Sequence, residues 1–253
     1  MAFQYVAAVN AFFGVNTLSL PEDTLTIFRD IGRATSVAER RLSEARVASR
    51  NGAVADAMRS AAGAVALAHH TAGPSVLAAV QVMERPPLAY AEYIRAAAAN
   101  VFLASTAFKA AYKAQVVAMA MHRPTDDPVL TPRMNQSVRD MATRAQQAHQ
   151  YYRATLDAAQ CVERDLAMQH AVAAHSEARD AARVVQSEAA ALLRHGPGSS
   201  SVTEHRAISE LLLYAAVSLV AAANSFDLVG DMDSNLAEPN NGSATEVVAD
   251  TNP

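Results

Sequence analysis

One stretch of the chain, residues 134–195, decides its fold class: MNQSVRDMATRAQQAHQYYRATLDAAQCVERDLAMQHAVAAHSEARDAARVVQSEAAALLRH. It contains neither glycine nor proline, the two residues that most often interrupt helices. Along its first half, apolar or small side chains recur at alternating steps of four and three residues, the spacing of a coiled-coil seam. This first seam consists of Met134, Val138, Met141, Ala145, Ala148, Tyr152, Thr155, Ala159, Val162 and Leu166. The stretch therefore predicts a long, Ala-rich, heptad-patterned helix that packs against a partner helix.

The second half of the stretch carries another seam in a different phase. This second seam consists of Ala171, His175, Ala178, Ala182, Val185, Ala189 and Leu192. The step of five from Leu166 to Ala171 means that a straight helix cannot keep both seams on one face. We therefore expect a bend near residues 167–170, or different partners for the two halves. At about 1.5 Å per residue an unbroken helix would be about 90 Å long, so it should break or protrude from the body.

Turn-forming residues divide the rest of the chain into further helices. Ser19 and Glu22 have the spacing of a capping box, which predicts a helix start, and Asn51-Gly52 predicts the end of that helix. Ser201 and Glu204 form another possible capping box, at the start of the last helix. Gly73-Pro74 and Pro86-Pro87 predict two more interruptions. We expect helices at residues 19–50, 53–71, 75–84, 88–122 and 201–230. Together with residues 134–195 they predict an all-α bundle of five to seven helices.

The pattern also predicts three parts along the chain. Residues 1–18 form an apolar N-terminal arm, and residues 19–230 form a single helical domain with sub-boundaries at 123–132 and 196–201. Residues 231–253 contain five acidic residues and no Lys or Arg, so we expect an acidic, flexible tail. Within the domain, the helices at 88–122 and 201–230 are apolar on most faces, which is typical of central helices.

Composition and charge limit the classes of partner. Apolar residues make up 51% of the 253 residues and aromatic residues 6%, and alanine alone is about a fifth, which indicates a globular helical protein. The formal net charge is −4, and it would be +1 without the acidic tail, so the body has no strong general attraction for nucleic acid, although a local groove could bind it. Only Lys109 and Lys113 are lysines; the many arginines are explained by a GC-rich genome or by phosphate recognition.

Motifs that would indicate an enzyme, a cofactor or a metal are missing from the sequence. No Glu is followed by His at the spacing of a di-iron site, and no two histidines have the spacing of a helical metal site. Phosphate-binding glycine loops and a serine nucleophile elbow are also missing, and Cys161 has acidic neighbours that would raise its pKa. Asp231 begins an imitation of a calcium loop, but Leu236 stands where the loop needs glycine. We therefore expect a protein that is not an enzyme and has no cofactor and no metal.

Arginines on two predicted helices are candidates for contacts with nucleic acid. They are Arg29, Arg33, Arg40, Arg46, Arg50, Arg139, Arg144 and Arg153. Tyr151 and Tyr152 lie beside them in sequence and could stack on bases. Acidic residues one turn away, such as Asp140 before Arg144, give the alternative explanation of solvated helix faces with internal ion pairs.

Apolar residues in the arm and in the first seam are candidates for self-association. They are Phe3, Tyr5, Phe12 and Phe13 in the arm and Val138, Met141, Ala145, Ala148 and Tyr152 in the seam. Exposed aromatic side chains are costly in water, so the arm should pack on its own domain or on a neighbouring subunit. The same two alternatives hold for the seam, because the periodicity is identical within and between chains.

These features lead to one functional hypothesis and two alternatives. We expect a non-catalytic structural protein that self-assembles into a homo-oligomer through helix–helix contacts, as a coat or capsid protein or another nucleic-acid-packaging protein does. The alternatives are a monomeric helical adaptor or inhibitor that binds a protein partner, and a small-molecule-binding helical bundle. No basic residue precedes the apolar arm, and the run from Leu211 to Ala223 is too short to span a bilayer. We therefore expect an intracellular protein, or one within a particle, with no N-terminal secretion signal and no membrane contact.

Overall fold

The structure, a computed structural model, describes residues 9, 11–85, 91–122, 129–198 and 200–237. Apart from a short helical segment ending at Phe13, its helices are α2 (Glu22–Arg50), α3 (Val54–Met83), α4 (Ala91–Ala120), α5 (Pro132–Gln160), α6 (Arg164–His195) and α7 (Val202–Ala237). These described residues include no strand, so the prediction of an all-α multi-helix bundle is confirmed.

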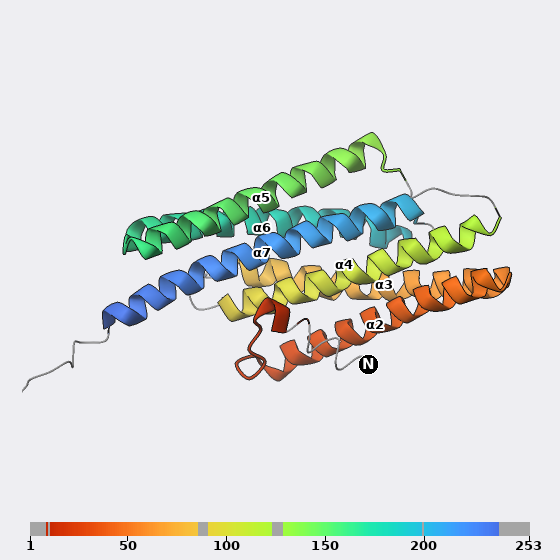
Figure 1. The fold of residues 1–253 in the computed structure, drawn as a ribbon, viewed down its shortest axis with the longest axis horizontal. Coiled ribbons are helices and arrows are strands. Elements are labelled where there is room, and N and C mark those ends of the chain that lie inside the picture. The colour runs from red at the N-terminus through yellow and green to blue at the C-terminus, as the bar shows by residue number, and fades with distance from the viewer. Residues whose placement is uncertain (1–8, 10, 86–90, 123–128, 199, 238–253) are drawn as a thin grey trace, which may run out of the picture.

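The helices form two units of three, and all run close to the long axis of the molecule (Figure 1). Helices α2, α3 and α4 contact one another in the first unit, and α5, α6 and α7 do so in the second. The units meet where α4 lies along α7 and where α3 touches α6. Helices α4 and α7 are therefore central, which agrees with their apolar sequences.

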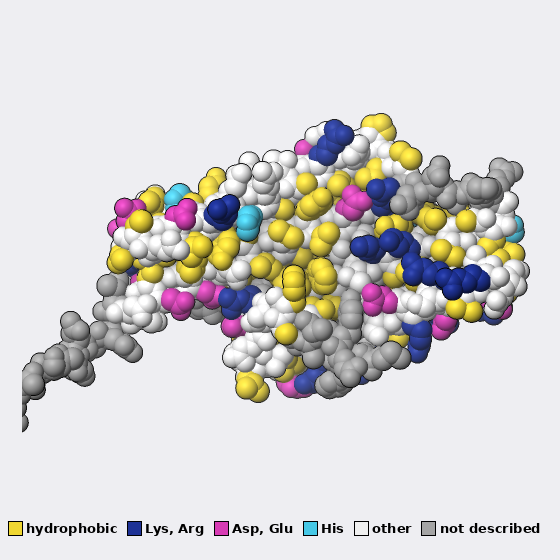
Figure 2. Space-filling model, in the orientation of Figure 1, with side chains coloured by type: hydrophobic (Ala, Val, Ile, Leu, Met, Phe, Trp, Pro, Cys, Tyr) yellow, Lys and Arg dark blue, Asp and Glu magenta, His cyan; other side chains and the backbone are white. Residues whose placement is uncertain are grey.

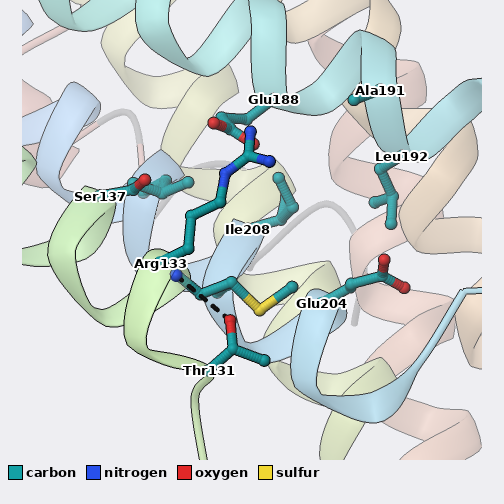
Figure 3. A pocket seen from close by; sticks show the side chains of 11 residues that line it. Thr131, Arg133, Ser137, Glu188, Ala191, Leu192, Glu204 and Ile208 are labelled. Carbon is teal, nitrogen blue, oxygen red and sulfur yellow. Dashed lines mark hydrogen bonds between the residues drawn. The ribbon is translucent and has the colours of Figure 1, made fainter.

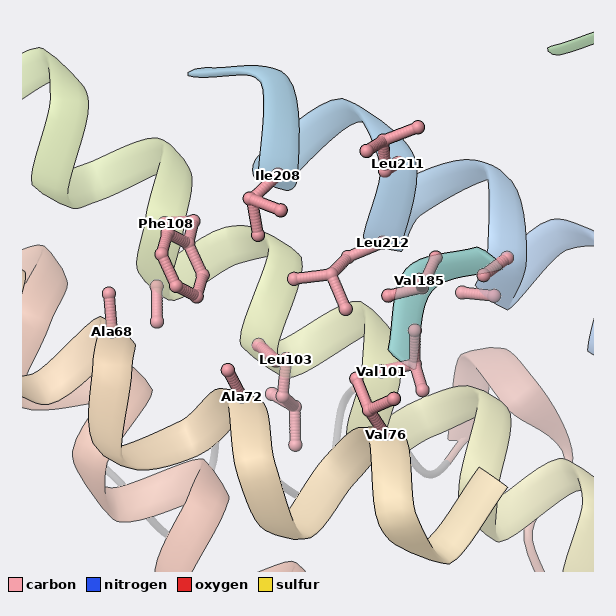
Figure 4. Packing of buried hydrophobic residues seen from close by; sticks show 14 of the residues in the cluster. Ala68, Ala72, Val76, Val101, Leu103, Phe108, Val185, Ile208, Leu211 and Leu212 are labelled. Atoms are coloured by element: carbon pink, nitrogen blue, oxygen red, sulfur yellow. The ribbon is translucent and has the colours of Figure 1, made fainter. Parts of the chain in front are cut away.

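Alanine and branched aliphatic residues fill the core between the two units. Figure 4 shows Phe108 and Leu103 of α4, Ala72 of α3 and Leu212 of α7 converging on one another. Phe108, Leu103, Ala72 and Leu212 have no exposed surface. Small alanine side chains on the facing helices let the axes approach closely around these larger groups. A second, smaller cluster around Phe226 fills the far end of the second unit.

Of the two alternatives for residues 134–195, the structure shows the break: the chain turns back at Cys161–Glu163, so one long protruding helix is wrong. Val162 has a φ of 61°, the left-handed conformation, and α5 and α6 pack side by side as a hairpin. The turn lies before residues 167–170, where the phase change predicted a bend. Valine is not a sequence signal for this conformation. Packing of α5 and α6 against each other and against α7 therefore places the turn.

The two seams face the interior of the same chain. Val138, Met141, Ala145 and Ala148 are buried in α5. All members of the second seam except His175 are buried in α6. The last two members of the first seam do not take part, since Val162 is 72% and Leu166 is 40% exposed. The seams therefore hold the second unit together within one chain.

Helix α3 continues through Pro74, where the sequence predicted an interruption between residues 71 and 75. Proline costs about 3 kcal/mol inside a helix because it removes a hydrogen bond and crowds the preceding turn. Ala72, Val76 and Ala79 on both sides of it remain buried. Their burial in the core outweighs the cost, so residues 53–71 and 75–84 belong to one helix.

Three helix ends test the capping signals in the sequence, and two of the three form as expected. Ser201 and Glu204 form a reciprocal capping box at the start of α7, with N–H···O distances of 2.6 and 3.1 Å. Ser19 and Glu22 do not: the Ser19 hydroxyl donates to the Asn16 carbonyl at 2.8 Å, and α2 starts after Pro21 without a side-chain cap. At the other end of α2, Asn51 and Gly52 terminate the helix as predicted.

The structure describes part of the arm and shows that helix α7 extends into the predicted tail. In the arm, Phe13 is buried against the Phe102 ring at 5.3 Å, whereas Phe12 is 80% exposed; Phe3 and Tyr5 lie outside the described residues. The packing of Phe13 favours the own-domain alternative. Helix α7 runs past Gly230 to Ala237, so residues 231–237 are helix and not tail, and residues 238–253 lie outside the described part.

An ion pair holds that extra helical segment in place. Arg164 at the start of α6 donates to both carboxylate oxygens of Asp233, at 2.5 and 2.9 Å. The contact lowers the pKa of Asp233 and raises that of Arg164. The sequence that imitated a calcium loop is therefore the last turns of α7.

Candidate anion-binding groove

We compare three cavities among the described residues. The first, of about 200 Å³, lies between α5, α6 and α7 (Figure 3). Arg133 points toward Glu188 there, and Thr131 accepts a hydrogen bond from the Met134 amide at 3.3 Å as the cap of α5. Two of its polar groups, Thr131 and Glu204, are already used as helix caps.

The second cavity, of about 410 Å³, is an apolar hollow between α3 and α4. Met58 and Met119 form its rim, and Pro197 and Gly198 cover part of it. Gln115 is the one polar side chain in the lining. A hollow with a single amide offers little for recognition or chemistry.

The third cavity, of about 420 Å³, is a groove where α2, α4 and α7 meet, and we call it the basic groove. Its lining includes the apolar residues Leu42, Phe102 and Leu213. Its other lining residues include Ser105, Thr106, Tyr112, Arg46, Lys109, Lys113, Glu39 and Glu210. Both lysines of the whole chain thus lie in one groove. Figure 2 shows Lys and Arg side chains in a row across α4 and α2 on this face.

The net charge of the basic groove is positive. Arg46, Lys109 and Lys113 form no ion pair with any residue that the structure describes; Arg46 and Lys109 are exposed and Lys113 is half-buried. Glu210 is paired with Arg206 at 3.0 Å. Glu39 is the second acid in the lining, and burial raises its pKa, so three cations stand against two carboxylates. An anion entering the groove would therefore meet uncompensated positive charge.

Hydrogen bonds between helices hold the walls of the basic groove in position. The hydroxyls of Ser105 and Ser209 each donate to the other's carbonyl, at 2.7 and 3.0 Å, which ties α4 to α7. The Thr35 hydroxyl lies 3.1 Å from the Leu103 carbonyl, which ties α2 to α4. All of these hydroxyls are buried, so the walls are rigid where they meet.

Of the eight arginines predicted to bind nucleic acid, only Arg46 lines the basic groove. Arg29, Arg33 and Arg40 form ion pairs on α2, and Arg144 lies near Glu177 and Asp180 of α6. Arg50, Arg139 and Arg153 are exposed, the last two on α5. The ion-paired members match the alternative of solvated helix faces, and the structure does not bring the eight together.

The tyrosines predicted to stack on bases have partners inside the molecule. The Tyr151 ring stacks 6.5 Å from the His170 ring, and Tyr152 lies 5.8 Å from His149. Sequence reasoning missed Lys109, Lys113 and Tyr112. The visible signal was two lysines one helical turn apart on an otherwise apolar helix, but only the fold shows that Arg46 lies beside them.

A buried cluster of polar rings lies elsewhere, between α3, α4 and α7. The Nε2 atoms of His69 and His205 are 3.1 Å apart, and His205 Nδ1 is 2.8 Å from Gln115 Oε1. Burial, with a smaller contribution from His69, lowers the pKa of His205 to about 4. No group of three or more metal-ligating side chains occurs within the described ranges.

One helix, at Val202–Asn235, is long and apolar enough to cross a membrane by length and hydropathy alone. In the apolar window that meets this test, 61% of the residues are buried inside the bundle. Burial to this degree is typical of the core helix of a helical bundle.

Comparison of the chain with protein families, with curated proteins and with solved structures found no match. The function is therefore argued from the side chains and their positions.

Proposed function

We propose that this chain is a non-catalytic structural protein that binds single-stranded nucleic acid in the basic groove. The observation that carries the proposal is the position of Lys109, Lys113 and Arg46, which form no ion pair among the described residues, around one groove.

The chemistry of the groove suits a flexible polyanion with flat apolar bases. Lysine and arginine neutralise phosphates, and Lys109 and Lys113 are one helical turn apart on α4. Phe102 and Tyr112 also line the groove, and the Phe102 ring already packs against Phe13 at 5.3 Å, so contact with bases is secondary to neutralisation of phosphates. The groove shows no regular ladder of base-edge donors, so we expect binding that depends little on sequence.

Assembly follows from the same binding. The seams that predicted helix–helix self-assembly are buried within one chain, so we propose that a shared strand of nucleic acid brings copies together. This is a packaging role without a preformed oligomer.

The small-molecule alternative has less support. Side chains fill the described core around Phe108, and the basic groove is open to the surface (Figures 2 and 4). A ligand-binding bundle would need an enclosed cavity.

The test is titration of a labelled oligothymidylate of about 20 nucleotides, followed by fluorescence anisotropy at several salt concentrations. Binding should weaken as salt rises. The double variant Lys109→Gln/Lys113→Gln should lower the slope of log affinity against log salt by about 1.4, because two phosphate contacts are lost. The matched control, Arg29→Gln/Arg33→Gln, removes the same charge from ion-paired positions on α2 and should bind like the wild type.

Three results would contradict the proposal: no binding by the wild type, equal losses in both double variants, or preferential capture of polyglutamate. The last would favour the adaptor alternative, with an acidic protein segment as partner. Light scattering with and without the oligonucleotide tests the assembly step, since added nucleic acid should increase the mass of the complex beyond one protein per strand.

A further inference from the structure

The buried histidine pair lies between the two units of the fold. His205 of α7 is completely buried and His69 of α3 is 8% exposed. The Phe108 ring of α4 lies 5.7 Å from one imidazole and 5.9 Å from the other. Three helices from both units therefore meet at two titratable rings that the basic groove does not use.

Hydrogen bonding determines which nitrogens carry protons. Gln115 Oε1 can only accept, so His205 Nδ1 donates to it across 2.8 Å. His205 Nε2 is then a bare acceptor, and His69 Nε2 donates to it across 3.1 Å. His69 Nδ1 is left as a buried acceptor with no partner. The geometry thus requires both rings to be neutral.

A proton added to the pair has no favourable position. If both Nε2 atoms carry hydrogen, two donors face each other across the 3.1 Å contact. If the proton goes to His69 Nδ1, the positive charge is buried beside a nitrogen that lacks an acceptor. Burial separately lowers the pKa of both histidines, because it disfavours the charged ring.

The charged groups around the pair do not compensate for such a proton. From α7, the Glu204 carboxylate is the one acid that acts on His205, and it already caps the Ser201 amide at 2.6 Å. The other charged contribution to the pKa of His205 comes from His69, and it lowers that pKa further. Acidification therefore introduces a buried charge with weak support.

We propose that His69 and His205 form a proton-operated latch that holds the first turns of α7, Val202–Leu213, against α3 and α4 and releases them on acidification. His205 lies in this segment, three residues after its start. Ser209, Glu210 and Leu213 of the same segment form the α7 wall of the basic groove. Release would therefore also open the groove; that consequence rests on the proposed function, whereas the latch itself does not.

Hydrogen exchange of the full-length protein at pH 7 and pH 5, corrected for intrinsic exchange rates, tests the latch. Between these values, a shift of the His205 pKa from 6.5 to about 4 corresponds to an about 20-fold increase in the opening equilibrium. Peptides from residues 202–213 should lose protection by about this factor. Peptides from α5 should lose much less.

A variant pair separates the latch from general acid sensitivity. His69→Gln/His205→Gln keeps an amide hydrogen bond between the two positions but cannot titrate, so protection of residues 202–213 should become independent of pH. His70→Gln, an exposed neighbour, should behave like the wild type. Equal loss of protection in all helices, or a double variant that keeps the pH dependence, would overturn the proposal.

Histidine ¹⁵N NMR of the wild type gives a second test that needs no variant. It should show hydrogen on Nδ1 of His205 and on Nε2 of His69, with no titration of His205 at pH 6. Titration of both rings near pH 6.5 would contradict the latch. Neither test involves an oligonucleotide. The latch is therefore confirmed or contradicted whether or not the groove binds nucleic acid.

Discussion

In each three-helix unit, the turn that joins the first two helices has the same hydrogen bonds but a different residue at its middle position. Residues 51–53 join α2 to α3, and residues 161–163 join α5 to α6. In both turns the last amide bonds a carbonyl five residues back, at 2.9 Å, and the middle amide bonds one three residues back, at 3.1 Å. The middle residue is Gly52, with φ of 70°, in one and Val162, with φ of 61°, in the other.

The difference shows that one turn is favoured locally and the other is imposed. Glycine adopts the left-handed conformation at little cost in free energy, whereas for a β-branched residue this conformation costs about 1–2 kcal/mol. Val162 is 72% exposed, so its own side chain recovers little of that cost by burial. The second turn therefore depends on the packing of α5 and α6 against each other and on α7.

The cores of the two units differ as well. Phe108 of α4 belongs to the large cluster that continues into α6 and α7. Phe226 of α7 belongs to the small cluster at the end where the α5–α6 turn lies, with Ala158, Ala167 and Val229. The end of the second unit thus combines a strained turn with a small core.

Truncation of the two phenylalanines is the strongest way to test this difference. Phe108→Ala should lower the free energy of unfolding by about 3–5 kcal/mol, because a fully buried ring leaves a cavity. Phe226→Ala should cost less and should increase hydrogen exchange mainly around residues 158–171. Urea denaturation measures both, with Phe12→Ala as the exposed control, which should change stability by about 0.5 kcal/mol or less. Equal costs and uniform exchange would show that the two cores are one.

Acid should weaken the junction between the units. The His205 pKa of about 4 in the folded protein lies below the unfolded value of 6.5, so the folded state binds fewer protons. This contribution to stability is complete above pH 6.5 and is lost as the pH falls toward 4. The loss should reach about 3 kcal/mol, and His69 and His175, whose pKa values burial also lowers, act in the same direction.

Urea denaturation at pH 7, 5.5 and 4.5 checks this expectation. His69→Gln/His205→Gln should show a smaller fall in stability than the wild type across this range. A wild-type midpoint that does not change with pH would contradict it.

Substitution of the two turn residues, Gly52 and Val162, should have the smallest effect and gives the most direct comparison. Gly52→Val should destabilise the protein by about 1–2 kcal/mol through backbone strain alone, since a Cβ there meets no atom within 4 Å. Val162→Gly should stabilise it by about 1 kcal/mol. Thermal and urea denaturation measure both, and Gly198→Ala, in open space without positive φ, serves as a control. Opposite signs at the two turns would confirm that strain is present at only one of them.

Part of the candidate site was visible in the sequence. Lys109 and Lys113 are the only lysines of the chain, and Arg46 was among the predicted arginines. Arg46 lies beside the two lysines only because α2 packs along α4, and no local sequence pattern predicts that packing. The His69–His205 contact joins residues 136 positions apart, so composition and spacing could not have predicted it.

The sequence by itself determined the all-α class, the end of α2 at Asn51-Gly52 and the capping box that starts α7. These features depend on helix propensity, on glycine in the left-handed conformation and on hydrogen bonds between near neighbours, all of which are local. Only the tertiary structure decided that α3 continues through Pro74, that Val162 forms a turn and that both seams face inward. At those positions burial of many apolar side chains across helices outweighs local preferences of about 1–3 kcal/mol, and burial depends on which distant segments meet.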